Sequence, residues 1–281
     1  MPSKAAPRPA SQAMEARMPR FNANLTMLFT EAPFLDRFAR ARKAGFDAVE
    51  FLFPYDFDKD DLKKALGENG LKQVLFNLPA GDWAAGERGF AIFPDRIDEF
   101  RRGVRSAIEY AGALGCRQIN CLSGVAPQKY TVETLHTTFV ANLRFAAEEL
   151  KKHGIKALIE PINHYDIPGF FLNTVEQADA IIGEVGSDNL FIQYDLYHQQ
   201  RTRGELIATY QKYKDRIAHI QLADNPGRNE PGTGEINYGF LFAALDAAGY
   251  DGWIGCEYKP KAGTEEGLGW LRRAEKAKAA A

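Results

Sequence analysis

The sequence predicts an α/β protein built as a single (β/α)₈ barrel, and three observations support this. Eight short apolar segments alternate with amphipathic segments from residue 21 onward, an order typical of parallel α/β folds. Several amphipathic segments end at a glycine that lies shortly before the next apolar segment, as left-handed helix caps do. The chain has 281 residues, close to the ~250 typical of one such barrel.

The expected strands are short and rich in aliphatic and aromatic residues, which is typical of strands buried in a parallel sheet. They are FNANL (21–25), AVEFL (48–52), KQVLFN (72–77), QINCL (118–122), KALIE (156–160), LFIQYD (190–195), IAHIQL (217–222) and WIGCE (253–257).

The expected helices lie between these strands, and most of them end at a glycine. They are expected over 33–44, 59–68, 95–114, 132–152, 174–185, 204–214, 238–248 and 264–279, with stops at Gly45, Gly70, Gly115, Gly154 and Gly249. A doubly wound sheet is the alternative, but it calls for a glycine-rich phosphate loop after the first strand. The segment NLTMLFTEAP at that point contains no glycine, so the barrel is favoured.

Composition narrows the function classes. The chain is 45% hydrophobic and 26% charged, with a formal net charge of −2, so nothing favours nucleic acid or an anionic membrane as a partner. No apolar stretch approaches the ~20 residues of a membrane span. Three cysteines, Cys116, Cys121 and Cys256, form no disulfide framework and indicate reduced thiols in a cytoplasmic protein.

The first residues differ in composition from the rest of the chain. The opening MPSKAAPRPASQAMEARMP is rich in Ala, Pro and Arg and has no apolar core, so a secretory signal is not expected. We expect residues 1–18 to form a flexible N-terminal extension and residues 19–281 to form the barrel domain.

Four polar side chains end four successive expected strands. Glu160, Asp195, Gln221 and Glu257 follow one another at intervals of 35, 26 and 36 residues, about the ~30 residues of one βα unit. The C-terminal ends of barrel strands meet at one mouth, where active sites lie. Three carboxylates and an amide oxygen there predict a site for Mg²⁺ or Mn²⁺.

Glu160 and Glu257 are also the candidate catalytic pair. Two carboxyl groups on either side of a substrate can move a proton between adjacent carbons, one as base and one as acid. A divalent cation between them would polarise a carbonyl group.

Five further residues are candidates for substrate binding. Arg228 lies in a long loop after the seventh expected strand, and its guanidinium suits a substrate carboxylate. His198 lies three residues beyond Asp195, and His219 shares a strand face with Gln221, although an inward histidine can also be a core residue. Asn77 and Asp166 are candidate hydroxyl binders. The loops after the third, fifth and seventh strands are long, which is more often functional than incidental.

The segments EPIN, PGFFLN, QYDLYHQQ, HIQLADNPGRNEPGTGEINY, GYDGWIGCEYKP and GLGW resemble the hydroxypyruvate isomerase family of xylose-isomerase-like barrels. The similarity covers residues 19–271. It implies that Glu160, Asp195, Gln221 and Glu257 hold the metal and that Glu160 and Glu257 are catalytic. The pattern of related sugar epimerases implies substrate contacts for His198 and Arg228.

The resemblance and the residues together favour a metal-assisted isomerase that interconverts hydroxypyruvate and tartronate semialdehyde through an enediolate. A 2-oxo-tetronate isomerase or a ketose 3-epimerase would use the same groups. A phosphodiesterase is disfavoured because it needs several zinc ions, whereas the chain has five histidines. A barrel that binds a metabolite without catalysis is the remote alternative. The expected partners are a small hydroxy-oxo acid and, through aromatic surface segments, a second copy of the chain.

Overall fold

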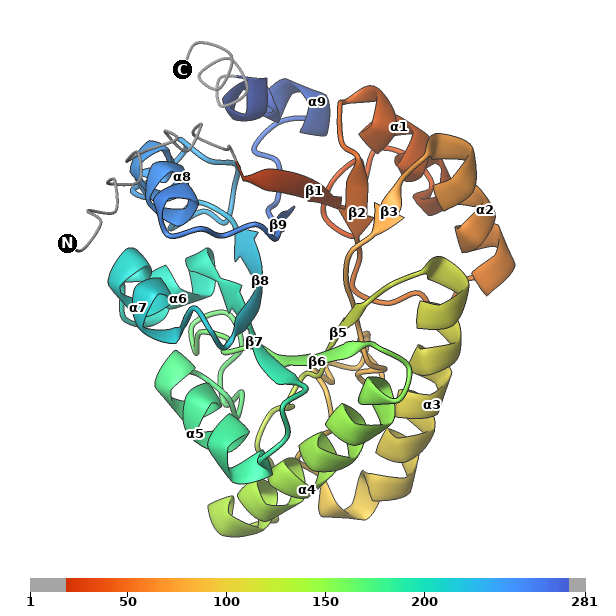
Figure 1. Cartoon of the computed structure of the whole chain (residues 1–281), viewed down its shortest axis with the longest axis vertical. Helices are drawn as coiled ribbons and strands as arrows, with labels where there is room; N and C mark the ends of the chain where they lie inside the picture. The colour runs from red at the N-terminus through yellow and green to blue at the C-terminus, as the bar shows by residue number, and fades with distance from the viewer. Residues whose placement is uncertain (1–18, 273–281) are drawn as a thin grey trace, which may run out of the picture.

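Parallel strands form a closed ring surrounded by helices in the computed structural model, which describes residues 19–272 (Figure 1). The strands are β1 (Arg20–Asn24), β2 (Ala48–Glu50), β3 (Lys72–Gln73), β4 (Phe76–Asn77), β5 (Gln118–Asn120), β6 (Lys156–Ile159), β7 (Leu190–Asp195), β8 (Ile217–Leu222) and β9 (Trp253–Cys256).

The α-helices alternate with the strands. They are α1 (Arg37–Lys43), α2 (Lys59–Asn69), α3 (Ile97–Leu114), α4 (Val132–Lys151), α5 (Val175–Val185), α6 (Leu196–Thr202), α7 (Leu206–Tyr213), α8 (Tyr238–Ala247) and α9 (Thr264–Gly267). Short 3₁₀ helices, Phe34–Asp36 and Pro94–Arg96, precede α1 and α3. No helix within residues 19–272 is long and apolar enough to span a bilayer.

The strand order shows why the ring is an eight-stranded barrel. The order is β3-β2-β1-β9-β8-β7-β6-β5-β4, and β3 and β4 are the two ends of the single strand expected over 72–77. Directly after β3, the Val74 N–H donates to the Val49 carbonyl of β2 (2.9 Å), and directly after β4, the Leu78 N–H donates to the Asn120 carbonyl of β5 (2.8 Å). The segment therefore joins β2 to β5 and closes the barrel, which confirms the predicted fold class.

Local sequence explains where the helices begin and end. Thr131 and Thr174 cap α4 and α5 by accepting a hydrogen bond from a backbone N–H three residues later, which satisfies a donor that has no partner within the helix. Gly115 and Gly186 end α3 and α5 in the left-handed conformation that glycine adopts without strain. The stop at Gly115 was predicted, whereas the one at Gly186 was not.

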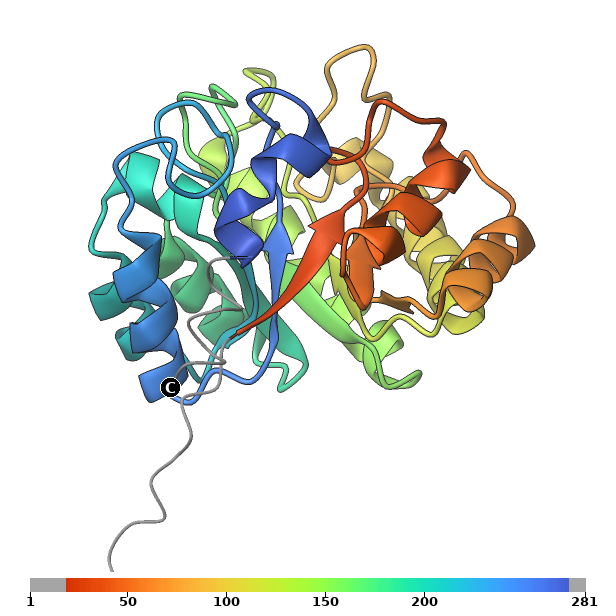
Figure 2. The ribbon, with the colours of Figure 1, turned by 90° about the horizontal axis from the view of Figure 1, so that it is seen from above.

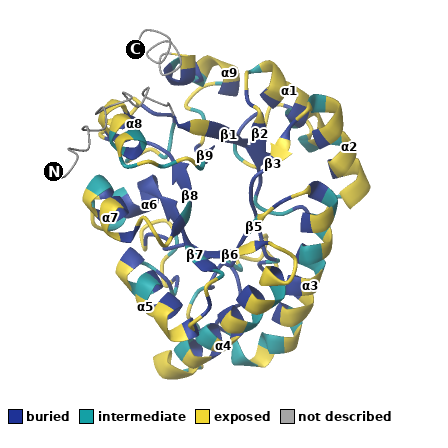
Figure 3. Ribbon diagram, viewed as in Figure 1, coloured by how far each residue is buried: buried dark blue, intermediate teal, exposed yellow. Residues whose placement is uncertain are grey.

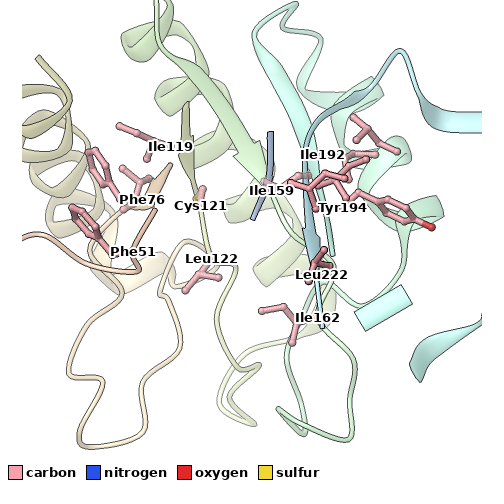
Figure 4. Close-up of a cluster of buried hydrophobic side chains, with 14 of the residues drawn as sticks. Phe51, Phe76, Ile119, Cys121, Leu122, Ile159, Ile162, Ile192, Tyr194 and Leu222 are labelled. Atoms are coloured by element: carbon pink, nitrogen blue, oxygen red, sulfur yellow. The ribbon is translucent and has the colours of Figure 1, made fainter. Parts of the chain in front are cut away.

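The main apolar core lies between the strands and the surrounding helices. The helix faces turned toward the barrel are buried and the opposite faces are exposed (Figure 3). Figure 4 shows part of this core, including Ile119, Ile159 and Ile192 from β5, β6 and β7. The three cysteines are free, as predicted, and all three are buried.

The barrel interior holds a second, smaller apolar cluster and, above it, polar residues. Leu158 belongs to this cluster, and the partly buried Phe191 packs against it. Side chains two residues apart share a strand face, so the same faces of β6 and β7 carry Glu160, Gln193 and Asp195 further along. The interior therefore changes from apolar to polar toward the C-terminal ends of the strands, where the long loops gather (Figure 2).

Some expected helix bounds differ in the structure, and two expected segments lie at least partly outside the described residues. Helix α6 begins directly after Asp195, whereas a loop was expected there, because the Asp195 carboxylate accepts a hydrogen bond from the Tyr197 N–H (2.8 Å) and caps the helix. The 33–44 helix begins with a 3₁₀ turn. The extension at 1–18 and the final part of the 264–279 helix lie outside the described residues.

Candidate active site

The four predicted metal-binding side chains all lie at the C-terminal mouth of the barrel. Glu160 directly follows β6, Asp195 ends β7, Gln221 lies near the end of β8 and Glu257 directly follows β9. Asp195 pairs with Gln221 in the sheet register, and Gln221 pairs with Gly255. All four are at most 5% exposed. The structure therefore brings together the four side chains that the spacing in the sequence predicted to meet.

Three ligand atoms of this mouth lie close enough to share one cation. Oxygens of Glu160 and Asp195 and a ring nitrogen of His198 all lie within 4.8 Å of one another. His198 Nε2 is 3.9 Å from Glu160 Oε1 and 3.6 Å from Asp195 Oδ2. Both distances are longer than a hydrogen bond, which leaves space for an ion between the side chains of Glu160, Asp195 and His198.

Arg228 connects Glu257 to this group. Its Nη2 lies 3.5 Å from Glu257 Oε2 and 3.8 Å from Asp195 Oδ2, while its Nη1 lies 3.5 Å from Asp166 Oδ2. The guanidinium also lies over the Tyr197 ring, 5.1 Å from its centroid. Arg228 thus faces three carboxylates at the mouth, in a position to bind an anion that competes with them.

Asp224, which follows β8, organises the loop that carries Arg228. Its buried carboxylate accepts hydrogen bonds from five backbone N–H groups, those of Asn225, Gly232, Thr233, Gly234 and Ile236, at 2.8 to 3.0 Å. A Cβ at position 234 would lie 2.0 Å from the Asn225 carbonyl oxygen, so only glycine fits there. Arg228 itself has a φ of 54°, a left-handed conformation that this loop holds in place.

The mouth carboxyl groups resist ionisation in the metal-free protein. Burial, reinforced by Glu257 and Asp195, raises the pKa of Glu160 well above its usual value. Burial raises the pKa of Glu257 to about 8 and that of Asp195 to about 6, although Arg228 opposes both shifts. Burial would lower the pKa of Arg228, but the surrounding carboxylates outweigh it and raise the pKa.

These residues fit a divalent cation. Asp195 Oδ2 is buried and accepts no hydrogen bond from any described residue, although buried carboxylate oxygens are normally paired. Burial and mutual repulsion disfavour the charged forms of these carboxyl groups. A cation between them would therefore strongly stabilise their ionised forms. The oxygens of Glu160, Asp195, Gln221 and Glu257 are carboxylate and carboxamide oxygens, which suit a hard cation.

Gln221 is held from both sides by other side chains. Its Oε1 accepts a hydrogen bond from Gln193 Nε2 (2.6 Å), and its Nε2 donates to Glu50 Oε1 (2.7 Å). Gln193 also hydrogen-bonds Glu160. The amide oxygen of Gln221 is therefore on the side of Glu160, and its amide nitrogen faces the barrel interior.

His219 lies in this interior and is fully buried, not at the open mouth. Its Nε2 is 2.8 Å from Glu50 Oε2. This contact is that of a core histidine with a polar partner, the alternative noted for this residue, and its contact with a substrate stays a prediction.

Glu50, on β2, is the main feature that the sequence reasoning missed. Its four partners are the side chains of Asn22, Asn24, His219 and Gln221. A Cβ at Gly255, on β9, would lie 2.4 Å from both carboxylate oxygens, so glycine at this position leaves room for the Glu50 carboxylate. A glutamate inside the apolar run AVEFL was the available signal.

Asn77 and Asp166 each reach the candidate metal ligands through one intervening side chain. Asn77 Oδ1 accepts from Asn120 Nδ2 (3.2 Å), which also donates to Glu160 Oε2 (3.0 Å). Asp166 Oδ1 accepts from the Tyr197 hydroxyl (3.1 Å) and faces Arg228. Both are therefore one residue removed from the candidate metal ligands.

Tyr197 and Arg201 were not predicted. Arg201 Nη1 donates to the Tyr197 hydroxyl (3.0 Å) and lies 3.7 Å from Asp166 Oδ1. Both belong to α6, on the helical turns that follow Asp195. Once that helix is known, positions one turn apart share a face, which would have placed Tyr197 and Arg201 together.

The fold and this site belong to a recognised class. Residues 38–274 match the model of the xylose isomerase-like TIM barrel family, and the chain is a member of that family.

Individual relatives share nearly the full length of the chain. The chain is 56% identical to hydroxypyruvate isomerase of Escherichia coli over 254 residues, which cover 90% of this chain and 98% of that protein. It is 49% identical to 2-oxo-tetronate isomerase of Cupriavidus necator, covering 91% and 98%. A crystal structure from Brucella melitensis described as an AP endonuclease, family 2, superposes with a TM-score of 0.89 at 46% identity, covering 91% and 99%.

Proposed function

We propose that this protein is an isomerase of a small hydroxy-oxo acid, and that it interconverts hydroxypyruvate and tartronate semialdehyde. The 56% identity to a hydroxypyruvate isomerase supports the substrate class. The observation that carries the chemistry is a pair of buried carboxyl groups, Glu160 and Glu257, in one mouth, both with a raised pKa and with the guanidinium of Arg228 beside them.

Glu160, Asp195, Gln221 and Glu257 would hold a divalent cation, Mg²⁺ or Mn²⁺. When bound, the cation would polarise the substrate carbonyl and stabilise negative charge on the neighbouring oxygens.

The two glutamates would move the carbon-bound proton. One removes a proton from C3 of hydroxypyruvate to leave the enediolate, and the other delivers a proton to C2, while the hydroxyl proton passes from the C3 oxygen to the C2 oxygen. A pKa near 7 gives a carboxyl group access to both protonation states at neutral pH, and the raised pKa of Glu257, about 8, approaches this range.

The remaining predicted residues would bind the substrate. Arg228 would hold the substrate carboxylate with two parallel hydrogen bonds, replacing its contacts to the protein's own carboxylates. His198 would donate a hydrogen bond to a substrate oxygen, and Asp166 and Asn77 would lie near the outer hydroxyl group.

A four-carbon acid is the second candidate, favoured by the 49% identity to a 2-oxo-tetronate isomerase. A ketose 3-epimerase would use the same glutamates. For nucleic acid we propose no role, because the chain carries a net charge of −2 and the metal-binding group found among residues 19–272 contains one histidine.

A substrate panel in deuterated water tests these proposals. The purified protein with Mg²⁺ or Mn²⁺ is given hydroxypyruvate, 2-oxo-tetronate and a ketose, and the product and the exchanged carbon are identified by NMR. We expect the highest kcat/KM with hydroxypyruvate and deuterium at C2 of the product. A preference for 2-oxo-tetronate would select the second candidate, and no turnover of any oxo acid would refute both.

A further inference from the structure

The side chain of Asn163, in the loop after β6, has a fixed orientation. It is fully buried, and its Oδ1 accepts hydrogen bonds from the backbone N–H groups of Tyr165 (3.0 Å) and Asp166 (2.9 Å). Rotating the amide by 180° would turn its NH₂ group toward two N–H donors and leave all of them unpaired, which is costly in a buried site. The Nδ2 of Asn163 must therefore point the other way.

In that direction lies His198. Asn163 Nδ2 is 2.6 Å from His198 Nδ1, and the Asn163 backbone N–H points to the same ring nitrogen at 3.5 Å. Both Asn163 groups can only donate. His198 Nδ1 must therefore carry a lone pair, because a proton there would face two donors. This excludes both the Nδ1–H tautomer and the doubly protonated ring.

We propose that Asn163 is a positioning residue that holds His198 in the Nε2–H tautomer, so that the ring offers the mouth a hydrogen-bond donor and no metal ligand. Nε2 is the atom that faces Glu160 and Asp195. The inference deepens the proposed function. The part that rests on that function is the hydrogen bond from Nε2–H to a substrate oxygen. The tautomer itself rests only on the contacts of Asn163.

The tautomer decides what kind of metal the mouth can take. Two carboxylates and a histidine nitrogen would form a mixed site suited to zinc, whereas oxygen ligands alone suit Mg²⁺ or Mn²⁺. With a proton on Nε2, His198 cannot contribute its nitrogen, and the ligands left are oxygens.

The wild-type protein gives the first test. Nitrogen-15 NMR of the histidine rings in the full chain, without metal or substrate, distinguishes a bare ring nitrogen from a protonated one, and His198→Gln assigns the signals. We expect a bare Nδ1 and a protonated Nε2. A protonated Nδ1 would overturn the proposal, and this result does not depend on whether any variant folds or on any measured turnover.

Asn163→Asp gives the second test. One carboxylate oxygen would keep the two backbone N–H groups, while the other would accept a hydrogen bond from a protonated Nδ1, so we expect the tautomer to reverse. The freed Nε2 lone pair should raise the ratio of Zn²⁺ to Mn²⁺ affinity, measured by calorimetry, by about 10-fold or more, the scale of other changes behind a metal ligand.

Asn173→Asp is the matched control, because it adds the same charge to the same loop but its side chain bonds the Ile162 carbonyl (2.9 Å). We expect it to leave both the tautomer and the affinity ratio unchanged. The proposal fails if Asn163→Asp retains the wild-type tautomer, or if Asn173→Asp reproduces the change in the ratio. A protein that shows the expected tautomer but no turnover would refute the proposed function alone.

Discussion

The barrel buries two groups of carboxyl residues that behave in opposite ways. Glu50 lies in the interior and keeps its charge, whereas Glu160, Asp195 and Glu257 at the mouth lose theirs readily. Burial alone raises the pKa in both places, but His219 and the hydrogen bonds to Glu50 outweigh it and lower the pKa of that residue. The difference teaches that the supply of hydrogen-bond donors, and not depth, decides which buried acid is structural and which is reactive.

The geometry of the two groups agrees with this division. Each oxygen of Glu50 accepts two hydrogen bonds, from Asn24 and Gln221 on Oε1 and from Asn22 and His219 on Oε2, at 2.7 to 3.1 Å. At the mouth, Asp195 Oδ2 accepts none from the described residues. The first group is complete without a ligand, while the second would acquire its missing partners from the proposed cation and substrate.

Glu257→Gln should show the largest effect on activity. The substitution keeps the size of the side chain but removes the acid or base, which is worth ~10²–10⁴-fold in rate, so we expect kcat to fall about 10³-fold. The free energy of unfolding of the metal-free protein should stay the same or rise, because a buried acidic group is removed. Steady-state kinetics and urea unfolding measure the two. Turnover near the wild-type level would mean that Glu257 is not part of the catalytic pair.

Glu50→Gln should reverse this pattern and act mainly on stability. The new NH₂ group would face side chains that now donate to Glu50, and each buried donor left unpaired costs about 1–3 kcal/mol. We expect the urea midpoint to fall accordingly, with Glu257→Gln as the matched control of the same chemistry at the mouth. Equal stability of the two variants would remove the distinction between the two groups.

Much of this site was predictable because parallel strands and βα spacing leave little choice about where strand ends meet. The sequence placed Glu160, Asp195, Gln221 and Glu257 together from spacing alone, and the structure has them at one mouth. Their roles as ligands and catalysts remain predictions. The fold followed from the same regularity of strand, helix and glycine.

The sequence could not show the features of the site that depend on contacts between distant strands and loops of the barrel. Glu50 lies 169 residues before its partner His219, and no local pattern indicates that four side chains from two other strands, β1 and β8, converge on one carboxylate. Asn163 is similar, because its effect on His198 requires the turn at 163–166 to be formed first. Strand spacing predicts which residues reach the mouth, but not which donors they meet there.

Arg228→Lys should give an intermediate effect, because it keeps the charge that faces the mouth carboxylates but loses the planar pair of donors. A carboxylate held by two parallel hydrogen bonds is bound less well by a point charge. We expect KM for the oxo acid to rise about 10-fold, or about 1.4 kcal/mol, with a smaller change in kcat. Arg203→Lys is the control, because Arg203 is an exposed partner of Glu176 at 3.8 Å. An unchanged KM would contradict the role of Arg228 in holding the carboxylate.

The pH dependence of stability without metal tests the mouth group directly. Burial raises the pKa of Glu257 from 4.5 to about 8 in the folded protein, so between these values the folded state binds a proton that the unfolded state has released. Stability should therefore fall as pH rises from about 5 to about 8. Thermal unfolding in the presence of a chelator measures this fall, and Glu257→Gln should have a shallower slope. Mn²⁺ should raise the melting temperature most at pH 8, where the cation competes with the fewest protons. A wild-type slope equal to that of Glu257→Gln would show that this carboxyl group is already ionised in the metal-free fold, and the contrast with Glu50 would then have to rest on hydrogen-bond geometry alone.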